Sequence, residues 1–142
     1  MTATAYRIVP VPPELVADLW PTIEALVEQG VAAGPGDRWA EDYRVACAEG
    51  RCQLWLVGEE GPASGIAITE VLRFPRRRVA HIDLLAGDGL PKWQAALDAA
   101  LCDWARQRGC QAIQGWAARK GWLRQIDGLG YRQFGAPMRK EL

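Results

Sequence analysis

The sequence predicts one mixed α+β domain over residues 1–142, with a central sheet of about six strands and about four flanking helices. A chain of 142 residues can bury one hydrophobic core but is too short for two. Short β-type runs alternate along it with segments of helical apolar spacing. Three of the β-type runs follow one another directly, whereas a long helical segment separates the next two. These patterns favour an antiparallel meander followed by a parallel β-α-β crossover.

The first third of the chain predicts one strand and two helices. Residues 6–11 (YRIVPV) are a β-type run that ends at two prolines. Residues 14–30 (ELVADLWPTIEALVEQG) have apolar residues at helical spacing, and Pro21 is expected to kink or split this helix because it lacks a backbone donor. A loop at 32–37 precedes a short helix at 38–50 (RWAEDYRVACAEG), which ends at a glycine.

The middle of the chain predicts the meander. Strand-type runs occupy residues 52–60 (CQLWLVGEE), 61–74 (GPASGIAITEVLRF) and 77–87 (RRVAHIDLLAG). The turn signals EEGPAS and FPRRR separate them.

The last third predicts the crossover and a closing strand. An apolar stripe over residues 93–109 indicates a long amphipathic helix that ends at a glycine. A strand at 110–118 (CQAIQGWAA), a short helix at 121–130 (GWLRQIDGLG) and a strand at 131–142 (YRQFGAPMRKEL) are expected to follow.

The chain as a whole carries no strong charge. Lys and Arg number 17, as do Asp and Glu, so nucleic-acid binding is not expected. The run RFPRRR at 73–78 is suited to binding a phosphate of nucleic acid or CoA. Arginines at a hairpin tip are, however, more often only solvent-exposed. No apolar run reaches the roughly 20 residues of a membrane helix, and no signal peptide is recognised. We therefore expect a cytoplasmic protein with no membrane partner.

The cysteines and tryptophans give weaker indications. The four cysteines form no CxxC pair and have no neighbouring His, so we expect buried, reduced thiols and no metal site. Seven tryptophans are many for this length and suit a core, a ligand cleft or an association surface. A homodimer is therefore compatible with the sequence.

The order of elements, the motif LLAGDG before the amphipathic helix and the motif GLGY after a short one resemble the GNAT superfamily of acyl-CoA-dependent N-acyltransferases over nearly the whole chain. Small GNAT-like proteins of phages and prophages are a narrower likeness. The resemblance implies acetyl-CoA, or another acyl-CoA, as co-substrate, with its pantetheine along strand 79–86. It implies that the pyrophosphate lies on backbone amides of the turn 87–92, where a helix begins. The implied cofactor-binding residues are Leu84, Leu85, Ala86, Gly87, Gly89 and Lys92.

The turn GDGLPK departs from the family's pattern at Asp88. A carboxylate just before a helix is a good N-cap, and it would take the same amides as a phosphate while repelling the phosphate. Two interpretations therefore stay open. In one, Asp88 caps the helix and no ligand binds. In the other, Gly87, Gly89 and Lys92 form a modified phosphate cradle, in which the lysine offsets the carboxylate.

The resemblance also implies a tyrosine in the last helix that reprotonates the departing CoA thiolate. Counted back from Gly130 and Tyr131, the family's Asn, Ala and Tyr positions hold Arg119, Trp122 and Ile126 here. Isoleucine cannot donate a proton, so the acid must come from elsewhere, from Tyr131 or from solvent.

Two residues are candidates for the base that takes a proton from the acceptor amine. His81, the only histidine, lies two residues before Asp83 on the presumed central strand, so both side chains point to one face. Glu70, on the preceding strand, is the second candidate. Each also has a structural interpretation, in which a neighbouring carbonyl satisfies His81 and Glu70 is a solvated strand residue.

These features predict an acyl-CoA-dependent N-acyltransferase, most simply an N-acetyltransferase, that acts on an amine of a small molecule or a protein. The alternative is a non-catalytic member of the family in which the fold serves as a binding or structural module. The residues at the two departures from the family's motifs, Asp88 and Ile126, favour that alternative.

Overall fold

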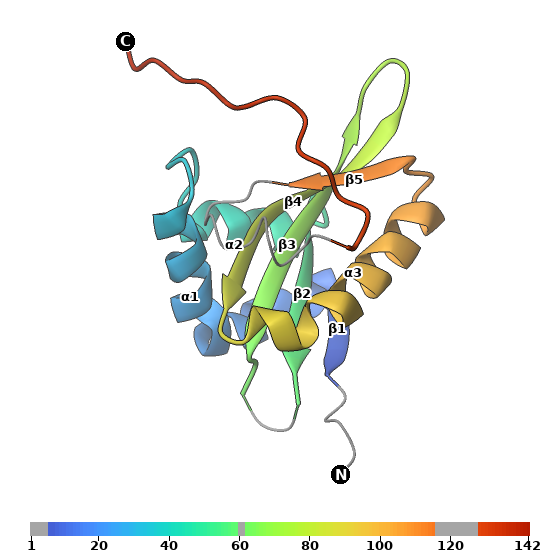
Figure 1. Ribbon diagram of the computed structural model, residues 1–142. Helices are drawn as coiled ribbons and strands as arrows, with labels where there is room; N and C mark the ends of the chain where they lie inside the picture. The colour runs from blue at the N-terminus through green and yellow to red at the C-terminus, as the bar shows by residue number, and fades with distance from the viewer. Residues whose placement is uncertain (1–5, 60–61, 116–127) are drawn as a thin grey trace.

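The computed structural model describes residues 6–59, 62–115 and 128–142. In these ranges five strands form one sheet in the order β1-β2-β3-β4-β5, and helices lie on both of its faces (Figure 1). The predicted mixed α+β class is confirmed. None of the helices in the same ranges is long and apolar enough to cross a membrane.

The elements agree closely with the predicted segments. The strands are β1 (Arg7–Val11), β2 (Gln53–Gly58), β3 (Gly65–Arg73), β4 (Arg78–Gly87) and β5 (Ala112–Gly115). The helices are a 3-10 turn, η1 (Pro13–Leu15), and α1 (Val16–Ala33), α2 (Ala40–Ala48) and α3 (Leu90–Gln107).

The strand pairing confirms the predicted meander and crossover. Strands β1 to β4 are antiparallel to their neighbours, and β5 pairs with β4 in parallel after α3. The β4–β5 register runs only from Val79↔Ala112 to Ile82↔Gly115, although β4 continues to Gly87. β3 pairs with β4 as far as Gly87, but on the side of β5 the described part of the chain places no strand beside the second half of β4.

The sheet separates two apolar layers. Side chains of α1 and α2, among them Trp20 and Ile23, pack on one face with Ile66 and Ile68 of β3. On the other face α3 packs against the alternate residues of the strands, such as Ala67. The two layers hold the middle of β3 and β4 between them, and the candidate bases Glu70 and His81 lie there.

Of the two expectations for Pro21, a kink or a split of the first helix, the split is wrong. Helix α1 runs through Pro21 without a break. Proline removes one backbone donor, the one that would bond the Ala17 carbonyl, near the start of the helix. Trp20 and Ile23, on either side, are buried against the sheet, and this packing keeps the helix continuous.

The predicted closing strand at 131–142 is also wrong. These residues have no regular secondary structure. They form an extended tail that begins near α3 and passes β5 (Figure 1). Gly135 has a φ of +73°, and Pro137 has no N–H for a strand ladder. Residues 128–130 form a turn. The rest of the predicted helix, with Trp122 and Ile126, lies outside the described residues, as does Arg119.

Candidate functional site

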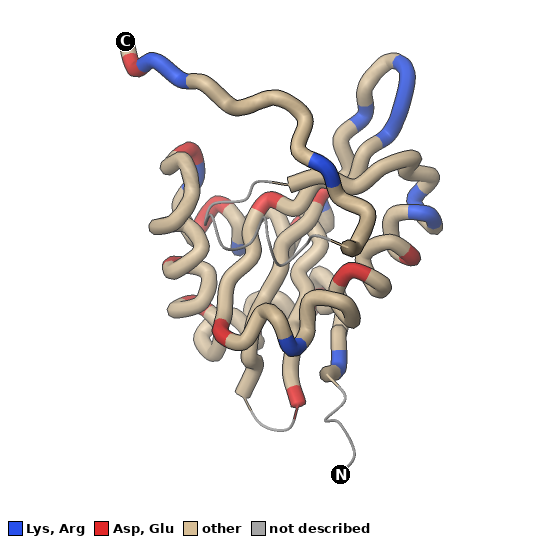
Figure 2. Tube along the Cα trace, in the orientation of Figure 1, with Lys and Arg blue, Asp and Glu red and all other residues tan. Residues whose placement is uncertain are grey.

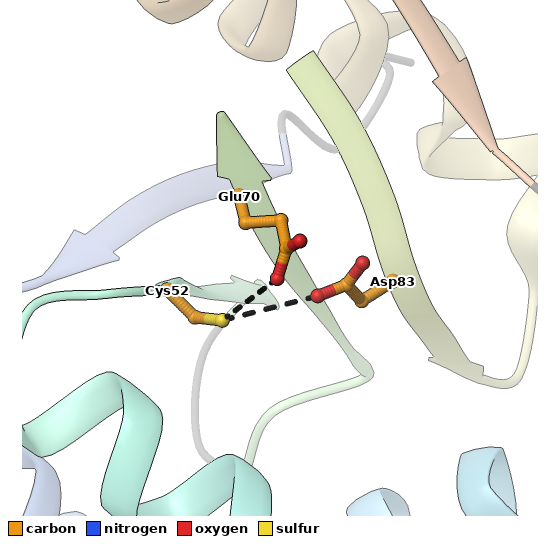
Figure 3. A group of neighbouring side chains, drawn as sticks. All are labelled: Cys52, Glu70 and Asp83. Carbon is orange, nitrogen blue, oxygen red and sulfur yellow. Dashed lines mark hydrogen bonds between the residues drawn. The ribbon is translucent and has the colours of Figure 1, made fainter. Parts of the chain in front are cut away.

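The candidate site begins with three polar residues in the middle of β3 and β4. Glu70 lies directly opposite His81 in the strand register. The pairing passes from Ile68↔Leu84 to Thr69↔Ile82, so Asp83 is an extra residue in β4, a β-bulge. The bulge turns the Asp83 side chain toward Glu70 (Figure 3). His81 Nε2 lies 3.4 Å from Asp83 Oδ1, so the predicted placement of these two side chains on one face is confirmed.

Arg38 and Cys52, from other elements, lie against these three residues. We call the five residues the carboxyl cluster: Arg38, Cys52, Glu70, His81 and Asp83. Arg38 lies in the loop between α1 and α2, and its Nη1 is 3.2 Å from Asp83 Oδ2 and 3.4 Å from Glu70 Oε2. Cys52, just before β2, donates from Sγ to Glu70 Oε2 at 3.5 Å and lies 3.8 Å from Asp83 Oδ2 (Figure 3). One cation and one thiol thus converge on two carboxyl groups.

The pKa values of the two carboxyl groups are shifted in opposite directions. Burial is the main reason that the pKa of Asp83 rises to about 7, and the neighbouring Glu70 raises it further. Burial also acts to raise the pKa of Glu70, but the hydrogen bond from Asp83 and the charge of Arg38 outweigh it and hold that pKa below its usual value. The Glu70 side chain is 20% exposed and that of Asp83 only 7%. Glu70 is therefore the ionised and more accessible member of the pair.

His81 is held from both sides. Burial lowers its pKa, so the ring is neutral at pH 7. The amide nitrogen of Gln114 on β5 lies 3.2 Å from His81 Nδ1. The other ring nitrogen, Nε2, faces Asp83. Within the described residues, the two ring nitrogens of His81 therefore face two side chains, and the neighbouring carbonyl of the structural interpretation is not seen there.

Cys52 takes part in the cluster as a thiol. Burial, with Asp83 and Glu70 nearby, raises the pKa of Cys52, and burial raises that of Cys47 to about 12. The ligand atoms of Cys52, Glu70 and Asp83 lie within 4.8 Å of one another, a spacing that a metal ion could use. A metal would take a thiolate. In the structure Arg38 supplies the positive charge that faces both carboxyl groups.

The turn before α3 differs from the capped-helix interpretation. Gly89, with a φ of +76°, is the N-cap of α3, and no side chain caps it, so the interpretation of Asp88 as a side-chain cap is wrong. Asp88 instead donates its N–H to the Ser64 carbonyl at 3.2 Å and accepts from Trp93 Nε1 at 2.8 Å through its own carbonyl. The N-cap is therefore Gly89 and not Asp88. A glycine adopts the αL conformation of this position readily.

In the second half of β4 the side chains pack into the two apolar layers, so the backbone is the part that a ligand could bind. Leu84 and Ala86 pack in the α1–α2 layer and Leu85 in the α3 layer. At Gly87, where φ is +128°, an added Cβ would lie 2.3 Å from the Ser64 carbonyl oxygen. This glycine is required by the close approach of β3, whatever binds nearby. The edge of β4 that has no partner within residues 6–59, 62–115 and 128–142 is contiguous with the N-terminus of α3.

Tyr131 lies apart from the other candidates. Its hydroxyl donates to Asp98 Oδ1 of α3 at 2.6 Å, and burial is the main reason that its pKa is raised. These contacts are with α3 and not with the carboxyl cluster. The structure thus brings His81 and Glu70 together and leaves Tyr131 on another element.

Comparison with solved structures identifies the fold. A ribosomal-protein-alanine N-acetyltransferase from Brucella melitensis biovar Abortus 2308 matches with a TM-score of 0.68 and 14% identity, over 97% of this chain and 100% of that one. A protein described as a predicted acetyltransferase from Clostridium acetobutylicum, solved with acetyl-CoA, matches with a TM-score of 0.68 and 14% identity, over 96% of each chain.

An aminoglycoside acetyltransferase from an uncultured soil metagenomic sample, in complex with sisomicin, matches with a TM-score of 0.67 and 15% identity, over 96% of this chain and 97% of that one. No protein-family model and no curated protein sequence matches the chain. The chain thus has the fold of these acetyltransferases over nearly its whole length.

Proposed function

This chain has the GNAT fold, and from that premise we propose that it is an acyl-CoA-dependent N-acyltransferase, most simply an N-acetyltransferase. One observation carries the proposal: the edge of β4 that has no partner among the described residues adjoins the carboxyl pair of Glu70 and Asp83, which belongs partly to the same strand. Acyl transfer to an amine needs both features. The acyl carrier needs a binding edge, and the amine must lose a proton before it attacks.

The proposed acyl-CoA site follows β4 into α3. The backbone of Leu84, Leu85 and Ala86 would pair with the pantetheine, and the start of α3 would hold the pyrophosphate. The absence of a side-chain cap at Gly89 supports this, because it leaves the positive end of α3 to an anion. Lys92, which is exposed, lies in the first turn of α3 and adds a positive charge. When bound, acyl-CoA supplies an acyl group activated as a thioester.

Gly87 and Gly89 would form the turn around the phosphates. Support comes from solved proteins of this fold. The Clostridium acetobutylicum protein was solved with acetyl-CoA, and an aminoglycoside N-acetyltransferase of the same fold was solved with CoA. An enzyme that depends on acyl-CoA is proposed to work in the cytoplasm.

Glu70 is the proposed base. It is ionised, it is the more exposed carboxyl of the pair, and it lies beside Asp83, whose pKa is about 7. Once Asp83 has lost its proton near pH 7, the pair can take up the proton of an incoming ammonium group through Glu70. One ring nitrogen of His81 lies against the Gln114 amide and the other faces Asp83, so its proposed role is to position Asp83. Tyr131, or solvent, stays the proposed source of the proton for the leaving thiolate.

The proposed acceptor is an amine of a small molecule. Two aminoglycoside acetyltransferases share the fold, and the carboxyl cluster offers negative charge to a cationic amine. A protein amine is the second candidate, because a ribosomal-protein-alanine N-acetyltransferase also shares the fold.

An acetyl-transfer assay tests the proposal. Thiol release from acetyl-CoA is followed with a panel of small cationic amines and peptide N-termini. We expect Glu70→Gln to lose about 10²- to 10⁴-fold in kcat/KM while it keeps the wild-type melting temperature. Glu49→Gln, which changes an exposed carboxylate paired with Arg51, serves as the matched control. Acetyl-CoA binding without transfer to any amine would instead favour the non-catalytic alternative.

A further inference from the structure

Six arginines form a surface that the proposed reaction does not use. We call it the arginine patch. Its residues come from the tip of the β3–β4 hairpin and the end of α3, and all are exposed: Arg73, Arg76, Arg77, Arg78, Arg106 and Arg108. Figure 2 shows both groups of basic residues at one corner of the molecule, on the hairpin that projects beyond β5 and on the neighbouring end of the helix.

Contacts between the two segments make the patch continuous. Arg78 Nη1 donates to the Arg108 carbonyl at 3.5 Å. The N–H of Gln111 donates to the Arg78 carbonyl at 2.9 Å. The base of the hairpin is therefore joined to the chain that leaves α3, although the two segments lie about 30 residues apart in the sequence.

Little negative charge offsets the patch. Among the ion pairs of the described residues, Asp103 is the only carboxylate bound to a patch arginine, and it pairs with Arg106 at 3.4 Å. The patch holds six of the 17 basic residues of a chain whose net charge is zero. The folded protein therefore has a local positive field at this patch, although its net charge is zero.

An aromatic ring stands among these charges. Phe74 is 50% exposed, and its N–H donates to the Arg77 carbonyl at 2.9 Å, which closes the hairpin. Pro75 fixes the backbone between these two residues. The ring is therefore held on a short, rigid turn with arginines on both sides.

We propose that the arginine patch binds single-stranded nucleic acid, with its guanidinium groups on phosphates and Phe74 stacked on a base. Planar guanidinium forks match phosphate oxygens, and an exposed aromatic ring is a stacking platform for an unpaired base. Phe74 is the only large exposed apolar side chain within residues 73–78, which is too little for insertion in a membrane. This inference replaces the expectation drawn from net charge, and it does not depend on acyl transfer.

Binding of fluorescein-labelled 20-nucleotide RNA and DNA strands, followed by anisotropy between 50 and 300 mM salt, tests the proposal. We expect the wild-type protein to bind one or both, with an affinity that falls steeply as salt rises. The variant with Arg73→Gln, Arg76→Gln and Arg77→Gln should bind at least tenfold more weakly. Its slope of log affinity against log salt should be smaller by about 2, since each lost contact to a single strand removes about 0.7. Phe74→Ala should bind about tenfold more weakly.

A control variant with the same loss of charge carries Arg7→Gln, Arg51→Gln and Arg139→Gln, at exposed positions away from the patch, and should bind like the wild type. Equal melting temperatures of the two triple variants establish that both are folded. The proposal is overturned if the wild type binds neither strand at 50 mM salt, or if the patch variant binds as well as the control. Patch-dependent binding to vesicles of phosphatidylcholine and phosphatidylserine, without binding to either strand, would also overturn it.

Discussion

Asp83 shows how one extra residue creates a buried carboxyl group. The bulge in β4 turns its side chain into the α1–α2 layer, where it is 7% exposed. Arg38 and Glu70 surround it with opposite charges, and burial has the larger effect on its pKa, which is about 7. The consequence is a carboxyl group that keeps its proton at a pH where an ordinary aspartate is ionised.

This raised pKa predicts how stability depends on pH. The pKa of Asp83 is about 7 in the folded chain against an ordinary value of 3.8, so its stabilising contribution is complete below pH 3.8 and is lost as the pH rises through about 7. Relative to Asp83→Asn, the free energy of unfolding of the wild type should fall by up to about 3 kcal/mol between pH 5 and pH 8.

Urea unfolding at both pH values measures the difference. Asp103→Asn, at an exposed carboxylate on α3, is the control and should follow the wild type. Parallel pH curves for the wild type and Asp83→Asn would show that Asp83 does not hold a proton in the folded protein.

The same pair predicts a pH–rate profile. With an acceptor amine that titrates well above this range, kcat/KM should rise as the pH passes about 7, because Asp83 then loses its proton. In Asp83→Asn, Glu70 keeps a low pKa beside Arg38, so the rise near pH 7 should disappear. In His81→Gln the carboxyl pair persists, and the rise should remain at a reduced rate. A rise that survives Asp83→Asn and vanishes in His81→Gln would assign the titration to the imidazole.

At the scale of elements, the turn between β4 and α3 depends on two glycines for different reasons. At Gly87 an added Cβ would meet the Ser64 carbonyl oxygen at 2.3 Å, whereas at Gly89 the nearest atoms are 3.8 Å away and only the φ of +76° is unfavourable. Gly87→Ala should therefore cost several kcal/mol of stability, and Gly89→Ala about 1 to 2 kcal/mol. Thermal unfolding of both variants measures this. Equal losses would show that the close approach of β3 does not constrain the turn.

Much of the element order was predictable, because it follows from apolar periodicity. The alternation of Ile66, Ala67 and Ile68 between the two faces is visible in the sequence, and so is the shared face of His81 and Asp83. The predicted closing strand had suitable residues, but strand formation needs a partner edge as well as a favourable composition.

The site was predictable only in part, because its contacts are long-range. The proximity of Glu70 and His81 was predictable, because the two residues lie on neighbouring strands. Arg38 reaches Asp83 across 45 residues and Cys52 reaches it across 31, and no local pattern indicates either contact. The bulge at Asp83 has no sequence signal, since alternation defines a register only when no residue is inserted.

For the molecule as a whole, β4 connects the features on which the proposed function depends. Its first half carries His81 and pairs with β5, and its second half leaves an edge free among the described residues. The carboxyl cluster lies on the α1–α2 face, and α3 begins just beyond the end of the strand. A ligand bound along β4 would thus extend from the N-terminus of α3 toward the proposed base.

Thermal unfolding with acetyl-CoA tests this central claim most directly. A ligand at 100 times its Kd stabilises the folded state by about 2.7 kcal/mol, which raises the melting temperature of a domain of this size by several degrees. We predict that shift for the wild type and for Lys140→Glu in the exposed tail, and a clearly smaller one for Lys92→Glu in the first turn of α3. No shift at millimolar acetyl-CoA, or an equal shift in all three proteins, would contradict an acyl-CoA site along β4 and α3.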